Sequence, residues 1–232
     1  MLILWDIDGT LLSSEGAGAQ GMELAGQEVF GAAFSLEGIE LGGRLDPLIV
    51  TDALARMGDI ELEPVHATFR ATFHGTLKQV LEGDHPLRIL PGAGELLRAL
   101  DDMAGVTQAL VTGNYQETAE LKLRAADIDP SMFAFGVYGD DGQVRNDLPP
   151  KALDRARVHL GDEPEAVILV GDTPHDVTSG KAAGCHVLAV CTGSHDADVL
   201  EAAGADLVID DLSEVEAVLA WMGIVRETWN HS

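Results

Sequence analysis

Short apolar runs with the character of β-strands alternate with helical segments along most of this chain. The expected strands are residues 2–7, 108–112, 134–138, 166–171, 187–191 and 207–209. The expected helices between them are residues 94–103, 117–126, 151–160, 177–183 and 197–203. Strand–helix–strand units with right-handed crossovers build a mainly parallel sheet that helices cover on both faces. The pattern therefore predicts an α/β fold with a doubly wound parallel sheet.

The alternation is interrupted once, after the first strand, where the pattern is helical up to about residue 88. The best helical segments in this stretch are residues 21–30, 47–57 and 64–81. We therefore expect a core of residues 1–13 and 88–232 and an inserted helical cap of residues 14–87. The expected linkers between cap and core are residues 12–18 and 84–91. Because the cap would emerge beside the end of the first strand, it is expected to lie over the carboxyl edge of the sheet.

The charge of the chain limits the partners that it can have. Lys and Arg total 14 against 39 Asp and Glu, which gives a formal net charge of −25. Such a field repels nucleic-acid backbones and anionic lipid surfaces, so neither is an expected partner. An anionic small molecule would need a bound cation or a few well-placed basic side chains. The sequence shows no signal peptide and no apolar run of about 20 residues, so a cytoplasmic protein is expected.

Two carboxylates follow the first expected strand. Asp6 and Asp8 are two positions apart, so their side chains share a face, and Gly9 allows the chain to turn away directly after them. Two carboxylates this close cannot both ionise without a cation or hydrogen-bond donors. A capped turn would explain a lone Asp-Gly, but it leaves Asp6 unexplained. The pair is therefore a candidate nucleophile with a proton-carrying partner.

A second acidic segment follows the expected strand that ends at residue 171. Thr173 and Pro174 have the character of a helix N-cap and first turn, which also explains Asp176. Capping does not explain Asp172, which falls at the edge where Asp6 is expected. Carboxylate oxygens suit a hard divalent cation, most simply Mg²⁺. The candidate metal ligands are Asp6, Asp8, Asp172 and Asp176.

Other candidate site residues lie on loops at the same edge or in the insertion. Thr112, Gly113 and Asn114 follow a strand and could cradle a phosphate, although Thr-Gly-Asn is also an ordinary helix cap. A lysine at a helix start opposes the helix dipole, so Lys151 is a candidate catalytic cation, with Arg145 on the same loop as its competitor. In the insertion, Arg44 is a candidate for binding an anionic part of a substrate.

These segments resemble the motifs of the haloacid dehalogenase superfamily over nearly the whole chain. Asp6-Ile7-Asp8-Gly9-Thr10-Leu11 is similar to its first motif, Thr112 to its second, Lys151 to its third, and Gly171-Asp172 with Asp176 to its fourth. The insertion is similar to that of the helical-cap subgroup, which includes phosphoglycolate phosphatases and β-phosphoglucomutases. Two departures are the missing Lys-Pro-x-Pro form of the third motif and the Gly113 that separates Thr112 from Asn114.

The resemblance implies a Rossmann-like core and a Mg²⁺-dependent phosphomonoester hydrolase that works through an aspartyl-phosphate. It implies that Asp6 attacks phosphorus, that Asp8 acts as acid and base, and that Thr112 and Lys151 hold the phosphoryl oxygens. The expected partner is a small-molecule phosphate ester, and the chain is expected to be a monomer or homodimer. A phosphosugar mutase of the same superfamily and a non-catalytic binding module stay open as alternatives.

Overall fold

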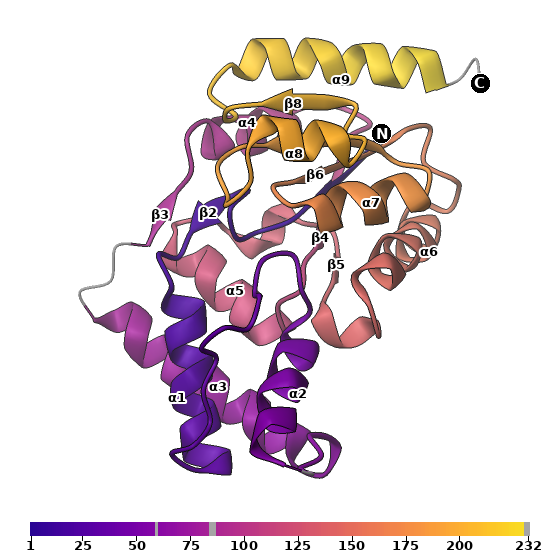
Figure 1. The fold of residues 1–232 in the computed structure, drawn as a ribbon. Helices are drawn as coiled ribbons and strands as arrows, with labels where there is room; N and C mark the ends of the chain where they lie inside the picture. The colour runs from indigo at the N-terminus through magenta and orange to yellow at the C-terminus, as the bar shows by residue number, and fades with distance from the viewer. Residues whose placement is uncertain (59, 84–86, 230–232) are drawn as a thin grey trace.

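The computed structural model describes residues 1–58, 60–83 and 87–229, and its core is a parallel six-stranded sheet. The strand order is β5-β4-β1-β6-β7-β8. The sheet and the helices around it fill the upper part of Figure 1. The strands are β1 Leu2–Trp5, β4 Thr107–Val111, β5 Gly136–Val137, β6 Val167–Gly171, β7 His186–Val190 and β8 Leu207–Ile209. This confirms the predicted α/β fold with a Rossmann-like, doubly wound sheet.

The central strands are apolar on both faces, as parallel sheets require. Every residue of β1 and β6 is buried, and β1 pairs with β4 on one side and with β6 on the other. The core helices are α4 Ala93–Asp101, α5 Gln116–Ala125, α6 Leu148–Leu160, α7 Pro174–Ala182, α8 Ala197–Ala202 and α9 Val215–Trp229. Because β1 lies between β4 and β6, the carboxyl ends of these three strands meet at the middle of one sheet edge.

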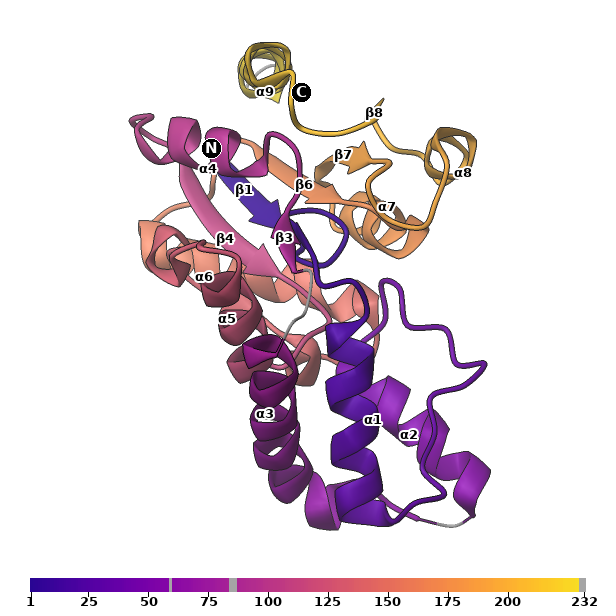
Figure 2. The same ribbon diagram turned by 90° about the vertical axis from the view of Figure 1, so that its left-hand side faces the viewer.

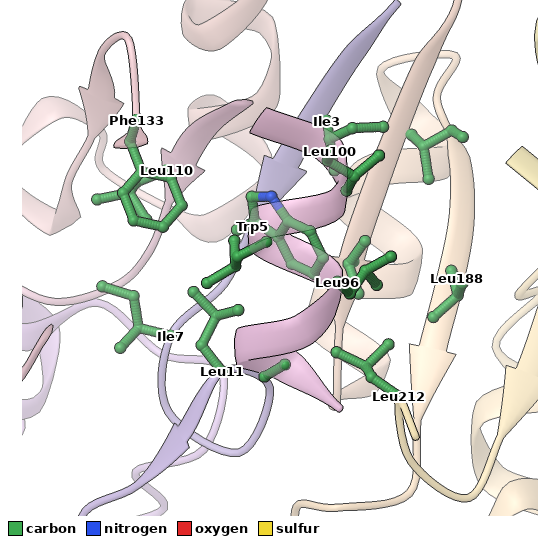
Figure 3. Packing of buried hydrophobic residues seen from close by; sticks show 14 of the residues in the cluster. Ile3, Trp5, Ile7, Leu11, Leu96, Leu100, Leu110, Phe133, Leu188 and Leu212 are labelled. Carbon is green, nitrogen blue, oxygen red and sulfur yellow. The ribbon is translucent and has the colours of Figure 1, made fainter. Parts of the chain in front are cut away.

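Two hydrophobic layers cover the two faces of the sheet. One layer packs Ile3 and Trp5 against side chains of α4, among them Leu96 (Figure 3). The same layer includes side chains of α5 and α9, among them Met222. The other layer packs Leu2 and Leu4 against side chains of α6, α7 and α8. Successive side chains of β1 thus point to opposite faces of the sheet and are buried in both layers.

Among the described residues between β2 and β3, three α-helices extend away from the sheet (Figure 2). They are α1 Ala17–Phe30, α2 Asp46–Met57 and α3 His66–Glu82. A hydrophobic cluster of their own, centred on Phe34, Phe69 and Phe73, holds them together. We call these helices and the loops between them the insertion.

The insertion leaves and rejoins the core through a small ribbon that the sequence pattern did not predict. β2 Leu12–Ser13 and β3 Arg88–Ile89 pair antiparallel, with Leu12 opposite Ile89 and Ser13 opposite Arg88. Part of the second expected linker, residues 84–86, lies outside the described residues. Within the described part of the chain, no helix has both the length and the apolar character needed to cross a membrane.

Side chains of α3 also tie the insertion to α5 of the core. The Arg70 guanidinium donates to both carboxylate oxygens of Glu117, at 2.8 and 2.7 Å, and bonds to Asp140. The same guanidinium lies 4.9 Å from the ring centre of Tyr115, whose hydroxyl is 2.9 Å from Nε2 of His66. These contacts hold the insertion close to the carboxyl edge of the sheet.

Candidate active site

A cavity of about 220 Å³ lies where the carboxyl edge of the sheet faces the insertion. The polar side chains of the core that line it are Asp6, Asp8, Thr112, Asn114, Lys122, Arg145, Asp172 and Thr173. Asp6 follows β1, Thr112 follows β4 and Asp172 follows β6. The central position of β1 therefore brings together residues that are far apart in the sequence.

Three buried carboxylates lie close together at this edge of the sheet. Oxygen atoms of Asp6, Asp172 and Asp176 lie within 4.8 Å of one another, and all three side chains are buried. Thr10 donates its hydroxyl to Asp172 at 3.2 Å. This grouping of hard oxygen donors is the kind that Mg²⁺ prefers.

Two glycines allow Asp172 to sit this close to the backbone. Gly9 has a φ of +79°, and a Cβ there would lie 2.4 Å from Oδ2 of Asp172. A Cβ at Gly193 would lie 1.7 Å from the same oxygen. Side chains at either position would therefore displace the carboxylate from the site.

Arg145 is the cation that the structure brings to these carboxylates. Its Nη2 donates to Asp6 Oδ1 at 3.0 Å and also bonds to Asp176, while the residue is only 6% exposed. Lys151 is exposed at the start of α6 and does not line the cavity. Of the two candidates for the third-motif cation, the structure thus buries Arg145 among the acidic residues and leaves Lys151 in solvent.

Asp176 is held by the helix cap that the sequence predicts and by Arg145. Thr173 and Asp176 form a reciprocal capping box at the start of α7, and the Thr173 hydroxyl donates to Asp176 Oδ2 at 2.6 Å. The other oxygen of Asp176 accepts from Arg145. Each oxygen of Asp176 thus accepts at least one hydrogen bond within the protein.

Burial and mutual repulsion act on the acidic groups. Burial raises the pKa of Asp6 to about 6, although the nearby Arg145 opposes that rise. Burial, together with the charges of Asp176 and Asp6, raises the pKa of Asp172 well above its usual value. Three carboxylates face one guanidinium here, so an additional positive charge would favour the ionised forms.

Asp8 belongs to a separate cluster on the same loop. Lys122 of α5 donates to Asp8 Oδ2 at 2.6 Å and to Asn114 Oδ1 at 2.7 Å, and Asn114 Nδ2 donates to Asp8 at 2.8 Å. Ser14 donates to the other Asp8 oxygen at 3.2 Å. Burial alone would raise the pKa of Asp8, but Lys122 and these hydrogen bonds outweigh it and lower that pKa below its usual value.

Lys122 was not among the residues expected in the site. It lies on the buried stripe of α5 with Thr118, Ala119 and Leu123, and its side chain is 4% exposed. A lysine is almost never buried without a partner. The signal in the sequence was therefore a lysine at a core-facing position of an amphipathic helix.

The Thr112–Asn114 loop contacts both Asp8 and the insertion. Thr112 is fully buried, and its Oγ1 accepts from the Asn114 side chain at 2.8 Å. The carbonyl of Gly113 accepts from the backbone N–H of Asp46 at 2.8 Å. A Cβ at Gly113 would lie 1.9 Å from the carbonyl oxygen of Arg44, so only glycine fits beneath the insertion at this point.

Arg44 and Asp46 are the charged residues that the insertion contributes to the cavity lining. The guanidinium of Arg44 bonds to Asp52 of α2 at 2.7 Å. The carboxylate of Asp46 accepts from the backbone N–H of Tyr115 at 3.0 Å, and burial raises its pKa to about 7. Arg44 therefore lies at the cavity, as expected, but with its charge already paired.

A family model described as haloacid dehalogenase-like hydrolase matches residues 1–184, which is most of the chain and includes all of the clusters above. The chain belongs to this family. The superfamily membership predicted from the motifs is thereby confirmed, and with it the prediction that the chain is a hydrolytic enzyme.

Curated relatives of this haloacid dehalogenase-like hydrolase are phosphatases. A pyrophosphatase PpaX from Oceanobacillus iheyensis is 25% identical over 218 residues, which cover 94% of this chain and 95% of the relative. A phosphoglycolate phosphatase from Vibrio parahaemolyticus is 28% identical over 224 residues, which cover 94% of this chain and 96% of that relative.

Solved structures of other proteins share the fold of this haloacid dehalogenase-like hydrolase. A hydrolase from Pseudomonas syringae has a TM-score of 0.67 at 20% identity, with 96% of this chain and 99% of that chain covered. A putative β-phosphoglucomutase from Thermotoga maritima has a TM-score of 0.63 at 22% identity, with 94% of this chain and 98% of that chain covered.

Proposed function

We propose that this chain is a Mg²⁺-dependent phosphomonoester hydrolase that acts through an aspartyl-phosphate on Asp6. The observation that carries the proposal is the separation of Asp6 and Asp8 into two clusters of different charge balance at one cavity floor. Asp6 lies among excess carboxylates, whereas Asp8 has its own cation. One loop thus offers a nucleophile and an independently held acid/base group.

Asp6 and Asp172, with a backbone carbonyl of the first loop, are the groups that we expect to hold Mg²⁺. The ion would supply charge neutralisation between the nucleophilic carboxylate and the phosphate dianion. The donor set fits, because buried Asp172 accepts a single side-chain hydrogen bond among the described residues, from Thr10. We do not expect the side chains of Asp8 and Asp176 to be ligands, since their oxygens already accept from other donors.

The chain's own residues account for the two steps. An oxygen of Asp6 attacks phosphorus and forms a P–O bond, the bond to the leaving oxygen breaks, and Asp8 gives that oxygen its proton. Asp8 then takes a proton from water as the water attacks phosphorus, which frees phosphate and restores Asp6. The first step thus needs protonated Asp8, and the second step needs ionised Asp8.

The remaining residues position these groups or the phosphoryl oxygens. We expect the Thr112 hydroxyl and the Gly113 backbone N–H to bind phosphoryl oxygens, while Asn114 and Lys122 orient Asp8. Arg145 takes the role of the third-motif cation in this proposal, because it bonds to Asp6 directly. Arg44, expected from the sequence to bind an anionic part of a substrate, lines the cavity but is paired with Asp52. The cytoplasmic location and the monomeric or homodimeric state stay predictions.

The proposal is tested by hydrolysis of a generic aryl phosphate with Mg²⁺ and with EDTA. We expect release of phosphate that EDTA abolishes and that Asp6→Asn lowers by about 10³-fold or more, since the amide cannot form the acyl-phosphate. The same assay tests the alternatives. A binding module would show no turnover, and a mutase would release phosphate slowly and depend on a sugar bisphosphate. Retention of more than about a tenth of kcat by Asp6→Asn would remove Asp6 as nucleophile.

A further inference from the structure

The cavity is polar on the side of the core and apolar on the side of the insertion. The large apolar side chains that the insertion contributes to its lining are Met22, Leu36, Leu41, Ile49 and Phe73. Met22, Leu36, Ile49 and Phe73 are at most 6% exposed and belong to the hydrophobic cluster of the insertion. We call these five side chains the roof. A substrate whose phosphate lies on Asp6 would direct the rest of its body toward the roof.

The five roof side chains carry no charge, and the basic group that the insertion adds beside them is already ion-paired. Arg44 is the basic residue of the insertion in the cavity lining, and its guanidinium is paired with Asp52 at 2.7 Å. The other charged insertion residue in the lining, Asp46, is an acid. On the core side, Lys122 and Arg145 are bonded to Asp8 and Asp6. A second anionic group on the substrate would therefore meet apolar side chains and a carboxyl group.

Burying an anion without a partner is costly, whereas burying a hydrocarbon against apolar side chains is favourable. The net charge of −25 adds to the cost of each negative charge that a substrate carries. The volume of about 220 Å³ suits a small substrate body.

Given the proposed phosphatase activity, on which this step rests, we propose that the substrate is a phosphate monoester of a small, uncharged and mainly apolar alcohol. The chain would thus differ from relatives named for pyrophosphate and phosphoglycolate, which both carry an anionic group beyond the phosphoryl group that is transferred. The apolar side chains of the roof would contact the hydrocarbon part of the substrate, and residues of the core would bind its phosphate group.

The sharpest test compares two esters of matched shape in the wild-type protein with Mg²⁺. Isobutyl phosphate has the same branching and number of non-hydrogen atoms as 2-phosphoglycolate, but methyl groups replace the carboxylate oxygens. We expect kcat/KM to be at least about tenfold higher for isobutyl phosphate, within the range that apolar pockets achieve. Pyrophosphate should also be a poorer substrate than isobutyl phosphate.

A charge placed in the roof should reverse this preference. Met22→Lys puts an ammonium group into the cavity, whereas Leu24→Lys adds the same charge to α1 at a position that is 42% exposed and outside the lining. We expect Met22→Lys to raise the ratio of kcat/KM for 2-phosphoglycolate over isobutyl phosphate by about tenfold or more. Leu24→Lys should leave that ratio at the wild-type value.

The outcomes separate the substrate class from the proposed function. Equal or greater kcat/KM of the wild type for 2-phosphoglycolate or pyrophosphate would overturn the apolar class while the phosphatase assignment stands. Absence of turnover on every ester, the aryl phosphate included, would overturn the phosphatase assignment itself. The comparison of kcat/KM values in the wild type tests the substrate class by itself, so the test does not depend on the folding of Met22→Lys.

Discussion

The two cation–carboxylate clusters at the cavity floor differ in their balance of charge. In the first cluster, the Arg145 guanidinium is ion-paired with Asp6 and Asp176, and the carboxylate of Asp172 lies beside them. In the second cluster, the described residues give the Lys122 ammonium one carboxylate partner, Asp8. The first cluster keeps an excess of negative charge and the second does not. A buried charge must be compensated, so the first cluster can gain from a metal ion and the second is complete without one.

This difference explains how two aspartates on one loop can have separate tasks. Asp6 has its pKa raised and Asp8 has its pKa lowered, although they are two residues apart. Pairs of titratable groups whose surroundings drive their pKa values apart are typical of acid/base sites. The predictions below disturb one cluster at a time.

Of the two cations, removal of the one in the first cluster should have the larger effect. We expect Arg145→Ala to lower kcat by about 10²- to 10³-fold, because a charge stabiliser at the reacting carboxylate is lost. Unfolding by denaturant should show a loss of about 3–5 kcal/mol in the free energy of unfolding, since two buried carboxylates lose their partner. Exposed Lys151→Ala is the matched control and should change neither quantity appreciably. The reverse ranking would return the cationic role to Lys151.

Removing the cation of the second cluster should act through Asp8. In Lys122→Met the effect of burial is no longer opposed by the ammonium, so the pKa of Asp8 rises. The ionised form that activates water then disappears at a higher pH than in the wild type, and we expect kcat to fall more steeply as the pH is lowered and to recover partly at higher pH. A pH–rate profile tests this. A uniform loss at all pH values would show that Lys122 supports structure rather than the state of Asp8.

Metal binding should depend on the first cluster alone. At a Mg²⁺ concentration of about 100 times Kd, the ion stabilises the fold by about 2.7 kcal/mol, which corresponds to a rise in Tm of about 5–10 °C for a chain of this length. We expect Asp172→Asn to remove most of this rise and Asp8→Asn to retain it. Thermal unfolding with and without Mg²⁺ measures both. Loss of the shift in Asp8→Asn as well would place Asp8 among the ligands.

The smallest effect concerns Asp46, where the insertion meets the core. Burial raises the pKa of Asp46 in the folded protein to about 7, above its ordinary value of 3.8, so folding favours the protonated acid and the wild type loses stability as pH rises between these values. Asp46→Asn keeps an acceptor for Tyr115 but does not titrate. Relative to this variant, the wild type should lose about 1.4 kcal/mol between about pH 5 and pH 6. Exposed Asp101→Asn, which also removes one charge, should show no such change.

The sequence predicted the core well because its strands are buried on both faces. Continuous apolar runs such as β1 and β6 cannot be mistaken for surface segments, and the expected helix ranges agree with the structure to within a few residues. The ribbon of β2 and β3 has only two residues in each strand, too few to show a periodicity. The long helix α9, Val215–Trp229, was also not predicted. The core helices were predicted from their position between two strands, and no described strand follows α9.

In the site, the sequence predicted the loops more reliably than the direction of long side chains. Asp6, Asp8, Thr112 and Asp172 follow strand ends, so topology alone brings them together. The choice between Arg145 and Lys151 depends on which part of the turn before α6 faces the carboxylates, and only the folded chain decides that. Lys122 reaches Asp8 across 114 positions of sequence, a contact that no local pattern reveals.

The β2–β3 ribbon also places the two ends of the insertion side by side. The chain leaves the core at Ser13 and returns at Arg88, and these residues pair with each other. Adjacent entry and exit points are what allow one domain to be inserted into another without disturbing either. A segment of different length or sequence could therefore be grafted between these two positions while the register of the sheet stays the same. Chimeras built at this joint would exchange the apolar roof for another one and leave the phosphate chemistry in place.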